Sequence, residues 1–431
     1  MMDIRDDQNL VFNITLAKFT GLYQMLNPQT IRCRGLNVHH FIMAFIVLYV
    51  CVIGMILTVS GVYYWTDNMP LSIDYIWKGI TCMSMFYPMC VIVHYSNAIW
   101  DCLSITCYGF TSHSLRDRHN CIQNHWRERS VLFTTTLTVL YFTSVTMFLV
   151  SSLSLSNVIL LVKNHDGSVG NYRHNIFNLY LFVSDDTYNA HYTMFYVVEA
   201  LGVLSFLITL YVFDFLLVTL CLAIRCQMQM VCTAFESVGH KLLSNDLSLV
   251  DCRDEKEKSP NKHDLIHDEL KTIIMDHQAV MKKYDAFFTI FKRALLLQIV
   301  VFSIGFIIVW FCFIMSFSND ERFIISRIFT VKIFSVIPSN LFKIFALCYL
   351  FGNLHDQKDS IIFALYSSNW TEMDMKCKKL ILLTMKMNNA NQKKLKFTRT
   401  RIVNLEMFFK TMRDSYSILS VLINYIKHMD E

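Results

Sequence analysis

Long apolar segments without charge constrain this chain more than any other feature. The segments 41–65, 131–162 and 294–318 contain no Asp, Glu, Lys or Arg, and each is at least 25 residues long. About 20 such residues cross a hydrocarbon core of about 30 Å. Because lipid offers the backbone no hydrogen-bond partners, a crossing segment must be a helix or part of a closed barrel. The chain is therefore predicted to be an all-α, polytopic membrane protein.

Four further segments are apolar enough to cross, although they carry charges. Ionisable side chains inside a span are costly and usually face a bundle interior or a polar partner. A composition of 54% apolar and 17% charged residues agrees with a membrane protein. The total of seven predicted crossings places the two termini on opposite sides of the membrane. The four segments are 71–95 with Asp74 and Lys78, 192–224 with Glu199 and Asp214, 323–351 with Arg327, Lys332 and Lys343, and 402–426.

Lys and Arg residues predict the orientation. With the N-terminus inside, 29 of them fall in cytoplasmic segments and 4 in external ones, and without the long 225–293 loop the ratio is still 18 to 4. We therefore expect a cytoplasmic N-terminus and an extracellular C-terminus. All 14 cysteines lie outside the predicted external stretches, so no external disulfide is expected.

The same topology divides the chain into four parts. They are a cytoplasmic N-terminal segment (1–40), six spans (41–351), cytoplasmic anchor helices (352–401), and a last span with a short external tail (402–431). Apolar residues at helical spacing predict a helix from Leu265 to Phe291 that runs into the fifth span, and another at Met375–Met387. We expect these helices to extend the spans into a cytoplasmic layer where subunits meet. Helices lying on the membrane surface are the alternative.

The last span carries one polar face. Polar side chains recur about every 3.5 residues, which places them on one side of a helix. A water-facing stripe in a span indicates a pore or a polar partner. The alternative is that Glu406, Lys410 and Asp414 form i,i+4 pairs that only fasten the helix. The stripe consists of Glu406, Lys410, Arg413, Ser417, Ser420 and Asn424.

Three features near the C-terminus resemble insect odorant receptors. They are the run 364–370 (ALYSSNW) after the sixth span, the Lys-rich helix that follows, and Ser415-Tyr416-Ser417 in the last span. The resemblance is close over about the last 80 residues and extends to the whole chain through span number, orientation and length. The sequences of segments 387–391 and 397–406 are similar to those of aphid receptors.

The resemblance implies a subunit of an odorant-gated, non-selective cation channel. Four subunits would join in the plasma membrane of a sensory neuron dendrite, with a co-receptor as the partner in a heterotetramer. The modest 225–293 loop and the Ser-Tyr-Ser tail suit the odorant-tuned subunit rather than the co-receptor. In this family the last span lines the pore for monovalent and divalent cations. The implied pore and gate residues are Lys410, Arg413, Ser417, Ser420, Ile423 and Asn424.

The resemblance also implies an odorant pocket in the outer halves of the second to sixth spans. Small apolar ligands bind in mostly hydrophobic cavities with a few orienting polar groups. Glu199 and Lys332 either bridge each other or meet a ligand oxygen, and a volatile such as a terpenoid alcohol or acetate ester would fit. The candidate ligand-binding residues are Ile76, Ile80, Met83, Tyr87, Met147, Val150, Ser151, Tyr192, Phe195, Tyr196, Glu199, Val203, Phe313, Phe329, Lys332 and Ile333.

Other functions remain open from the sequence. A gustatory-receptor-like channel is possible, although the Thr-Tyr with a downstream Gln-Phe of that group is missing. A transporter would need paired repeats or broken helices near the midplane, and a metabotropic seven-span receptor would signal without permeation. The sequence has no phosphate loop, no nucleophile elbow and no basic-aromatic strip. It therefore predicts neither an enzyme nor the binding of a cofactor or a nucleic acid. His263, His267 and Asp268 lack a third fixed ligand for a metal.

Overall fold

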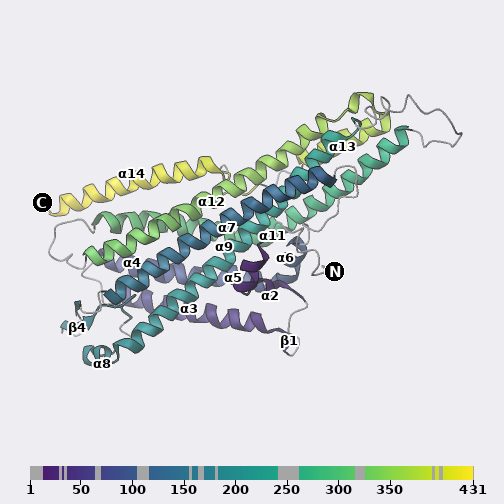
Figure 1. Ribbon diagram of the computed structural model, residues 1–431. Coiled ribbons are helices and arrows are strands. Elements are labelled where there is room, and N and C mark those ends of the chain that lie inside the picture. The colour runs from purple at the N-terminus through teal and green to yellow at the C-terminus, as the bar shows by residue number, and fades with distance from the viewer. Residues whose placement is uncertain are drawn as a thin grey trace.

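The computed structural model describes residues 13–430 with eleven gaps. These gaps are 29–31, 34–35, 64–68, 104–115, 155–157, 164–168, 180–182, 241–261, 316–325, 391–393 and 398–400. The described residues form an elongated bundle of long, roughly aligned helices (Figure 1).

Eight helices build the bundle, and short helices and hairpins decorate its ends. The bundle consists of α3 (Val38–Tyr63), α4 (Met69–Ser84), α5 (Phe86–His94), α7 (Arg116–Ser154), α9 (Tyr192–Ser237), α11 (Lys262–Met315), α12 (Ser326–Tyr366) and α14 (Leu405–Asp430). The smaller elements are α1 (Ile14–Phe19), α2 (Leu22–Leu26), β1 (Arg32–Cys33), β2 (Leu36–Asn37), α6 (Ser96–Leu103), β3 (Ile159–Lys163), β4 (Val169–Arg173), α8 (Asp185–Ala190), η5 (Trp370–Glu372) and α13 (Met375–Ala390).

Six of the described helical stretches are long and apolar enough to cross a membrane. They coincide with the first six predicted spans, and the second of them combines α4 and α5. The last helix, α14, has 26 residues and is also long enough to cross a membrane. α13 lies at one end of the bundle, while the C-terminal end of the chain lies at the other with β4 and α8 (Figure 1).

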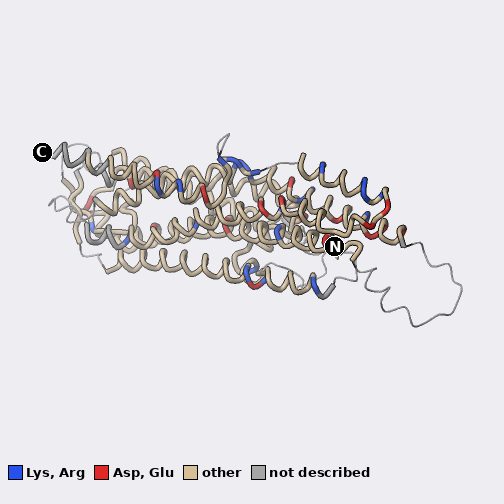
Figure 2. The backbone as a smooth tube through the Cα atoms, turned by 90° about the horizontal axis from the view of Figure 1, so that it is seen from above, with Lys and Arg blue, Asp and Glu red and all other residues tan. Residues whose placement is uncertain are grey.

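Two helices are far longer than a bilayer requires. At 1.5 Å per residue, the 54 residues of α11 extend about 80 Å, and the 46 residues of α9 about 70 Å. The hydrocarbon core is only about 30 Å thick, so half or more of each helix projects beyond it. Seen from above, Lys, Arg, Asp and Glu are most frequent toward the end that holds α13, and fewer of them lie in the opposite half (Figure 2). The helix predicted to run from Leu265 into the fifth span is present as the first part of α11.

The centre of the bundle is α9. In its most apolar stretch 94% of the residues are buried inside the protein, against 17% in α7. The neighbours α3, α7, α11 and α12 all pack on α9. Its side chains would meet protein on every side, whereas α7 presents most of its surface to the surroundings.

Glycines let α3 and α4 cross closely. A Cβ atom at Gly79 would lie 2.1 Å from Thr58 Oγ1 and 2.5 Å from the Gly54 carbonyl oxygen. Such distances are far below van der Waals contact, so no larger residue fits at Gly79 without moving α3. Small residues at helix crossings are a common device for close packing between membrane helices.

The C-terminal end of the third span was predicted wrongly. The span was expected over 131–162, but α7 ends at Ser154 and residues 159–163 form β3. Burial alternates along this strand, with Leu160 and Val162 buried and Ile159 and Leu161 exposed, which is the two-residue period of a strand. The strand pairs with β4 in an antiparallel register from Ile159↔Arg173 to Lys163↔Val169. A run of uncharged residues cannot distinguish these two structures.

Candidate functional site

A cavity of about 180 Å³ lies inside the bundle, between α4, α7, α9, α11 and α12. Its walls are mostly aromatic and aliphatic. Such an apolar enclosure with a few polar groups is typical of small-molecule sites. The lining residues are Asp74, Trp77, Lys78, Thr81, Cys82, Tyr141, Ser144, Val145, Phe148, Phe177, Val203, Phe206, Leu207, Leu210, Phe302, Gly305, Val309, Lys332, Ile333, Val336, Ser339 and Asn340.

Trp77 and Gly305 form one close contact in the cavity wall. A Cβ atom at Gly305 of α11 would lie 2.7 Å from the Trp77 ring on α4. The indole therefore lies directly against the α11 backbone, and only glycine leaves it room. Because both residues line the cavity, this contact sets part of its shape.

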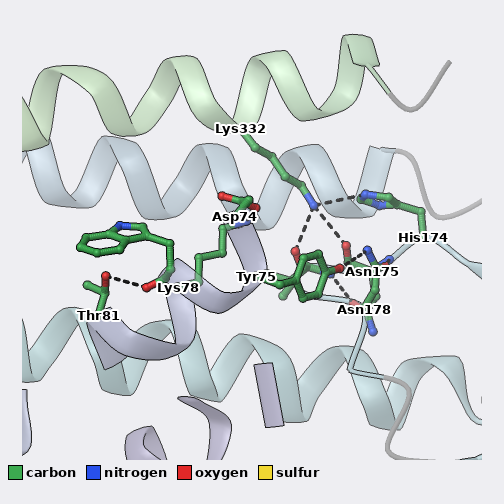
Figure 3. A network of polar contacts seen from close by, with 10 residues as sticks. Asp74, Tyr75, Lys78, Thr81, His174, Asn175, Asn178 and Lys332 are labelled. Carbon is green, nitrogen blue, oxygen red and sulfur yellow. Dashed lines mark hydrogen bonds and ion pairs between the residues drawn. The ribbon is translucent and has the colours of Figure 1, made fainter. Parts of the chain in front are cut away.

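An ion pair interrupts the apolar wall. Asp74 and Lys78 lie one turn apart on α4, and the Lys78 ammonium donates a hydrogen bond to Asp74 Oδ2 (Figure 3). The Asp74 side chain is 5% exposed and the Lys78 side chain 26% exposed. The Lys78 ammonium also lies 5.7 Å from the ring centroid of Tyr75 and 6.0 Å from that of Phe148. The carboxylate is thus covered, while part of the lysine remains accessible beside aromatic rings.

The loop 174–179, between β4 and α8, closes one end of the cavity. The Lys332 ammonium of α12 donates to the carbonyl oxygens of Asn175 and Ile176, at 3.1 and 3.2 Å, and lies 3.4 Å from His174 Nε2 (Figure 3). Three charge-assisted contacts therefore fasten the carbonyl side of this loop to α12. Phe177 of the same loop lines the cavity.

Glu199 of α9 holds the other side of the same loop. Its carboxylate accepts hydrogen bonds from the backbone N–H groups of Phe177, Asn178 and Leu179, at 2.6, 3.2 and 2.8 Å. The two charges were expected to bridge each other or to meet a ligand oxygen. No ion pair within 4 Å joins Glu199 to Lys332 in the described chain; instead the two clamp the loop from opposite sides. The backbone of the loop lies between α9 and α12.

His174 completes this clamp as a neutral side chain. Burial, and then the positive charges of Lys332 and Lys78, lower the pKa of His174 from 6.5 to about 3. The imidazole is therefore uncharged at neutral pH, and its Nε2 can accept a hydrogen bond from the Lys332 ammonium. A protonated His174 would instead place two cations 3.4 Å apart.

A second ion pair lies near the opposite end of the cavity. Lys343 Nζ of α12 lies 3.0 Å from Asp214 Oδ2 of α9, and the two side chains are 2% and 6% exposed. Tyr141 of α7 donates its hydroxyl hydrogen to the same carboxylate oxygen. The ammonium also lies 3.7 Å from the ring centroid of Phe302. This cluster joins the four helices α7, α9, α11 and α12, and Tyr141 and Phe302 line the cavity.

The structure places the predicted ligand-binding residues in three groups. Val203, Lys332 and Ile333 line the cavity. Phe329 lies in α12, but its side chain is outside the described residues. The others do not line the cavity, and five of them, Ile80, Tyr87, Met147, Val150 and Phe195, lie either on the exposed surface or in a separate buried cluster. The rest are Ile76, Met83, Ser151, Tyr192, Tyr196, Glu199 and Phe313.

Most of the residues in the cavity wall were not predicted from the sequence. Trp77, Phe148, Phe206 and Phe302 are aromatic residues of predicted spans, but aromatic residues are common in any helix core. Asp74 and Lys78 did give a signal, because they are charges inside a span one turn apart. That signal could have placed this face of α4 toward the cavity.

The polar face of α14 points away from its own bundle. The buried residues Met407, Phe408, Ser415 and Leu419 form the side that packs on α11 and α12. At 100° per residue, the stripe from Glu406 to Asn424 is centred opposite this side. Glu406, Arg413, Ser417 and Asn424 are exposed, and Lys410 and Ser420 are partly exposed. The side chain of Ile423 is outside the described residues.

The alternative in which Glu406, Lys410 and Asp414 pair along α14 must include a partner from outside the helix. Arg401, in the segment before α14, lies 4.0 Å from Asp414, and both side chains are about half exposed, at 45% and 48%. Asp414 therefore has a partner from outside the helix. Exposed pairs of this kind contribute little to stability.

One small buried cluster connects the cavity to α14. Leu419 packs with Phe311, Cys312, Ile333 and Ile337. Ile333 also lines the cavity, as does Val309, which packs against the cluster. A change in the position of the cavity wall can thus reach α14 through direct side-chain contacts.

Comparison with known proteins gives a family and a fold. The family model described as 7tm Odorant receptor matches residues 78–416. The olfactory receptor OR5 from Machilis hrabei in complex with eugenol superposes with a TM-score of 0.67 at 14% identity, covering 96% of this chain and 98% of that one. The structure of the same receptor described without eugenol gives 0.69 at 12% identity, covering 95% and 97%. No curated protein matches the sequence.

Proposed function

The chain belongs to the odorant receptor family, and from this premise we propose that it is the odorant-tuned subunit of an odorant-gated, non-selective cation channel. As a member of this family it is a receptor and not an enzyme. The proposal has three parts: a site for the volatile, a path for ions, and a connection between the two.

The internal cavity is the proposed site for the volatile. It is enclosed by five helices and has a largely aromatic wall, as expected for a site that takes a small hydrophobic molecule. One of the structurally similar receptors was solved in complex with eugenol. The position of the cavity replaces the wider set of contacts expected from the sequence, with Val203, Lys332 and Ile333 common to both. Terpenoid alcohols and acetate esters remain candidate ligands.

The polar face of α14 is the proposed ion path. This observation carries the proposal, because a helix that packs its apolar side on its own bundle turns the stripe from Glu406 to Asn424 outward. Such a stripe is costly against lipid, at about 2.5 to 3.5 kcal/mol for one charge at the centre of a span. Four subunits arranged around an axis would cover it in a hydrated pore. Ser417, Ser420, Ile423 and Asn424 would form the narrow part, with Lys410 and Arg413 nearer the cytoplasm.

The buried cluster around Leu419 is the proposed connection. A ligand that moves Ile333 or Val309 changes the packing of a cluster to which α14 contributes Leu419. Packed side chains interdigitate and do not deform continuously, so a small shift in the wall favours a second arrangement of the helix. Binding energy in the cavity would thereby be converted into opening of the pore.

Partners and location follow from the same assignment. We propose a cytoplasmic N-terminus, as the Lys and Arg distribution predicts, and hence an extracellular hairpin of β3 and β4. On α13, Leu382, Leu383 and Met387 are each more than half exposed, although α13 lies at the charged end of the bundle (Figures 1 and 2). These residues suit contact with neighbouring subunits. A co-receptor would complete a heterotetramer in the plasma membrane of a sensory dendrite.

Ligand-evoked current in cells that express the chain with a co-receptor tests the proposal. We expect a current only when both chains and an active volatile are present, and a reversal potential that follows Na⁺, K⁺ and Ca²⁺ replacement as for a non-selective cation channel. A response that persists with an impermeant cation as the only charge carrier would support metabotropic signalling instead. A flux coupled stoichiometrically to the volatile would support a transporter.

A further inference from the structure

We propose that the Asp74–Lys78 pair makes the cavity selective for neutral ligands with a carbonyl oxygen, such as aldehydes, ketones and esters. This inference rests on the proposed function, because it takes the cavity as the site of the volatile. It names a chemical class and the residue that recognises it.

The pair offers the ligand a hydrogen-bond donor. Both residues line the cavity, but the Asp74 side chain is 5% exposed and that of Lys78 is 26% exposed. The carboxylate is occupied by the ammonium that bonds its Oδ2. A ligand therefore meets the lysine, which can only donate, and a carbonyl oxygen, which can only accept, is its complement.

The other polar side chains of the wall are mostly engaged with the protein. The hydroxyl groups of Thr81, Tyr141, Ser144 and Ser339 donate to protein oxygens. Lys332 donates to the two carbonyl oxygens of the 174–179 loop. Lys78, the more exposed member of its ion pair, and the amide of Asn340 also line the cavity.

A hydrocarbon of the same shape should bind more weakly than a carbonyl compound. It would exclude water from the accessible part of Lys78 and leave a charged donor against carbon, which is unfavourable in an apolar cavity. A carbonyl oxygen replaces that water with a charge-assisted hydrogen bond. The expected difference in affinity is roughly tenfold to a hundredfold.

Ionised ligands should also bind weakly, because the charges around the cavity already balance. Lys78 and Lys332 supply two positive charges, and Asp74 and Glu199 supply two negative ones. A carboxylate or an alkylammonium group would add a charge without a partner in a site of low polarity. Neutral carbonyl compounds avoid this cost.

The test compares ligands of equal length on the full chain co-expressed with a co-receptor. Octanal, hexyl acetate and octene are the neutral members of one set, and octanoic acid and octylamine are its charged members. Corresponding sets with hexyl and dodecyl chains extend the comparison to other lengths. These sets are embedded in a broad panel of volatiles. We expect the half-maximal concentration for carbonyl compounds to be about tenfold lower or more than for the matched alkene, and the acid and amine to be the weakest.

Four variants assign the selectivity to the pair. Lys78→Met removes the donor but leaves Asp74 buried alone, so the double variant Asp74→Asn/Lys78→Met provides a version without charge. Lys78→Arg keeps a charged donor, and Asn340→Leu removes the other candidate donor of the same wall. Cell-surface labelling of each variant measures how much complex is available. The carbonyl preference should fall to about threefold or less in both Met variants and persist in Lys78→Arg and Asn340→Leu.

The outcomes separate this inference from the proposed function. A wild-type complex that responds best to hydrocarbons, acids or amines would overturn the inference and leave the channel proposal intact. A carbonyl preference that survives in the double variant, or that is lost in Asn340→Leu alone, would overturn it as well. A complex that reaches the surface and responds to no volatile of the panel would contradict the proposed function itself.

Discussion

Replacing Lys343 with methionine should destabilise the folded subunit strongly. Lys343 Nζ lies 3.0 Å from Asp214 Oδ2, and both side chains are almost completely buried. At that distance and an effective dielectric constant of about 20, the attraction is about 5 kcal/mol. Methionine has a similar length but cannot neutralise the carboxylate, which would remain buried with only the Tyr141 hydroxyl as a described donor.

The expected loss is about 3 to 5 kcal/mol of unfolding free energy, as for other buried pairs that lose one partner. The double variant Asp214→Asn/Lys343→Met removes both charges, and it should recover most of that loss because no unpaired charge remains. Tyr141→Phe removes one hydrogen bond to a charged acceptor, for an expected loss of about 1.5 to 3 kcal/mol.

Thermal unfolding of the detergent-solubilised complex, followed by size-exclusion chromatography, measures the order of these variants. The exposed pair Arg401–Asp414, with a separation of 4.0 Å, supplies the matched control, and Arg401→Met should cost less than about 1 kcal/mol. If Lys343→Met unfolds at the same temperature as the control, or if the double variant is less stable than Lys343→Met, the Asp214–Lys343 pair does not stabilise the bundle.

Three further predictions concern the cavity, α14 and the 174–179 loop. Gly305→Ala should displace the Trp77 ring, which lies 2.7 Å from the position of the added Cβ. The variant should change the order of potency of volatiles, while the current amplitude at saturation stays near wild type. An unchanged order of potency would contradict the contact. Asn424→Leu should alter conductance or open probability without changing that order, because Asn424 is exposed on the face of α14 away from the cavity; a changed order would move Asn424 out of the pore. Burial keeps the pKa of His174 at about 3 in the folded chain, against about 6.5 when the chain is unfolded. Between these two pH values only the unfolded chain takes up a proton at this group. Lowering the pH from 7.5 to 5 should therefore reduce the free energy of unfolding by up to about 2 kcal/mol. Below pH 6.5 the melting temperature of His174→Asn should depend less on pH than that of the wild type. An identical dependence would show that His174 is not buried as a neutral ring.

The sequence could predict the spans because lipid leaves a crossing chain few alternatives. Segments such as 41–65 and 294–318 had to be helices, and the first six predicted spans are found as membrane-length helices. Charges inside spans could also be recognised as needing partners. Asp74 and Lys78 pair with each other, Asp214 and Lys343 pair between helices, and Glu199 and Lys332 hold one loop.

The rotation of each helix about its axis could not be predicted in the same way. Met147 was predicted to meet the ligand, but its neighbour Phe148 lines the cavity, and one residue corresponds to a turn of about 100° on a helix. Adjacent residues of similar hydrophobicity give no signal for this choice. The partners of Glu199 were hidden for another reason, since they are backbone N–H groups of a loop and carry no side-chain signature.

Ion permeation along α14 requires that its polar face point into the pore, and thiol accessibility measures this direction directly. Ser417→Cys and Ser420→Cys lie on the polar face, whereas Ser415→Cys lies on the buried face of the same helix. A charged thiol reagent applied to the open, ligand-activated complex should block current rapidly in the first two variants and leave Ser415→Cys and the wild type unaffected. Equal reaction at all three positions, or block at Ser415→Cys alone, would show that the polar face of α14 does not line the path of the ions.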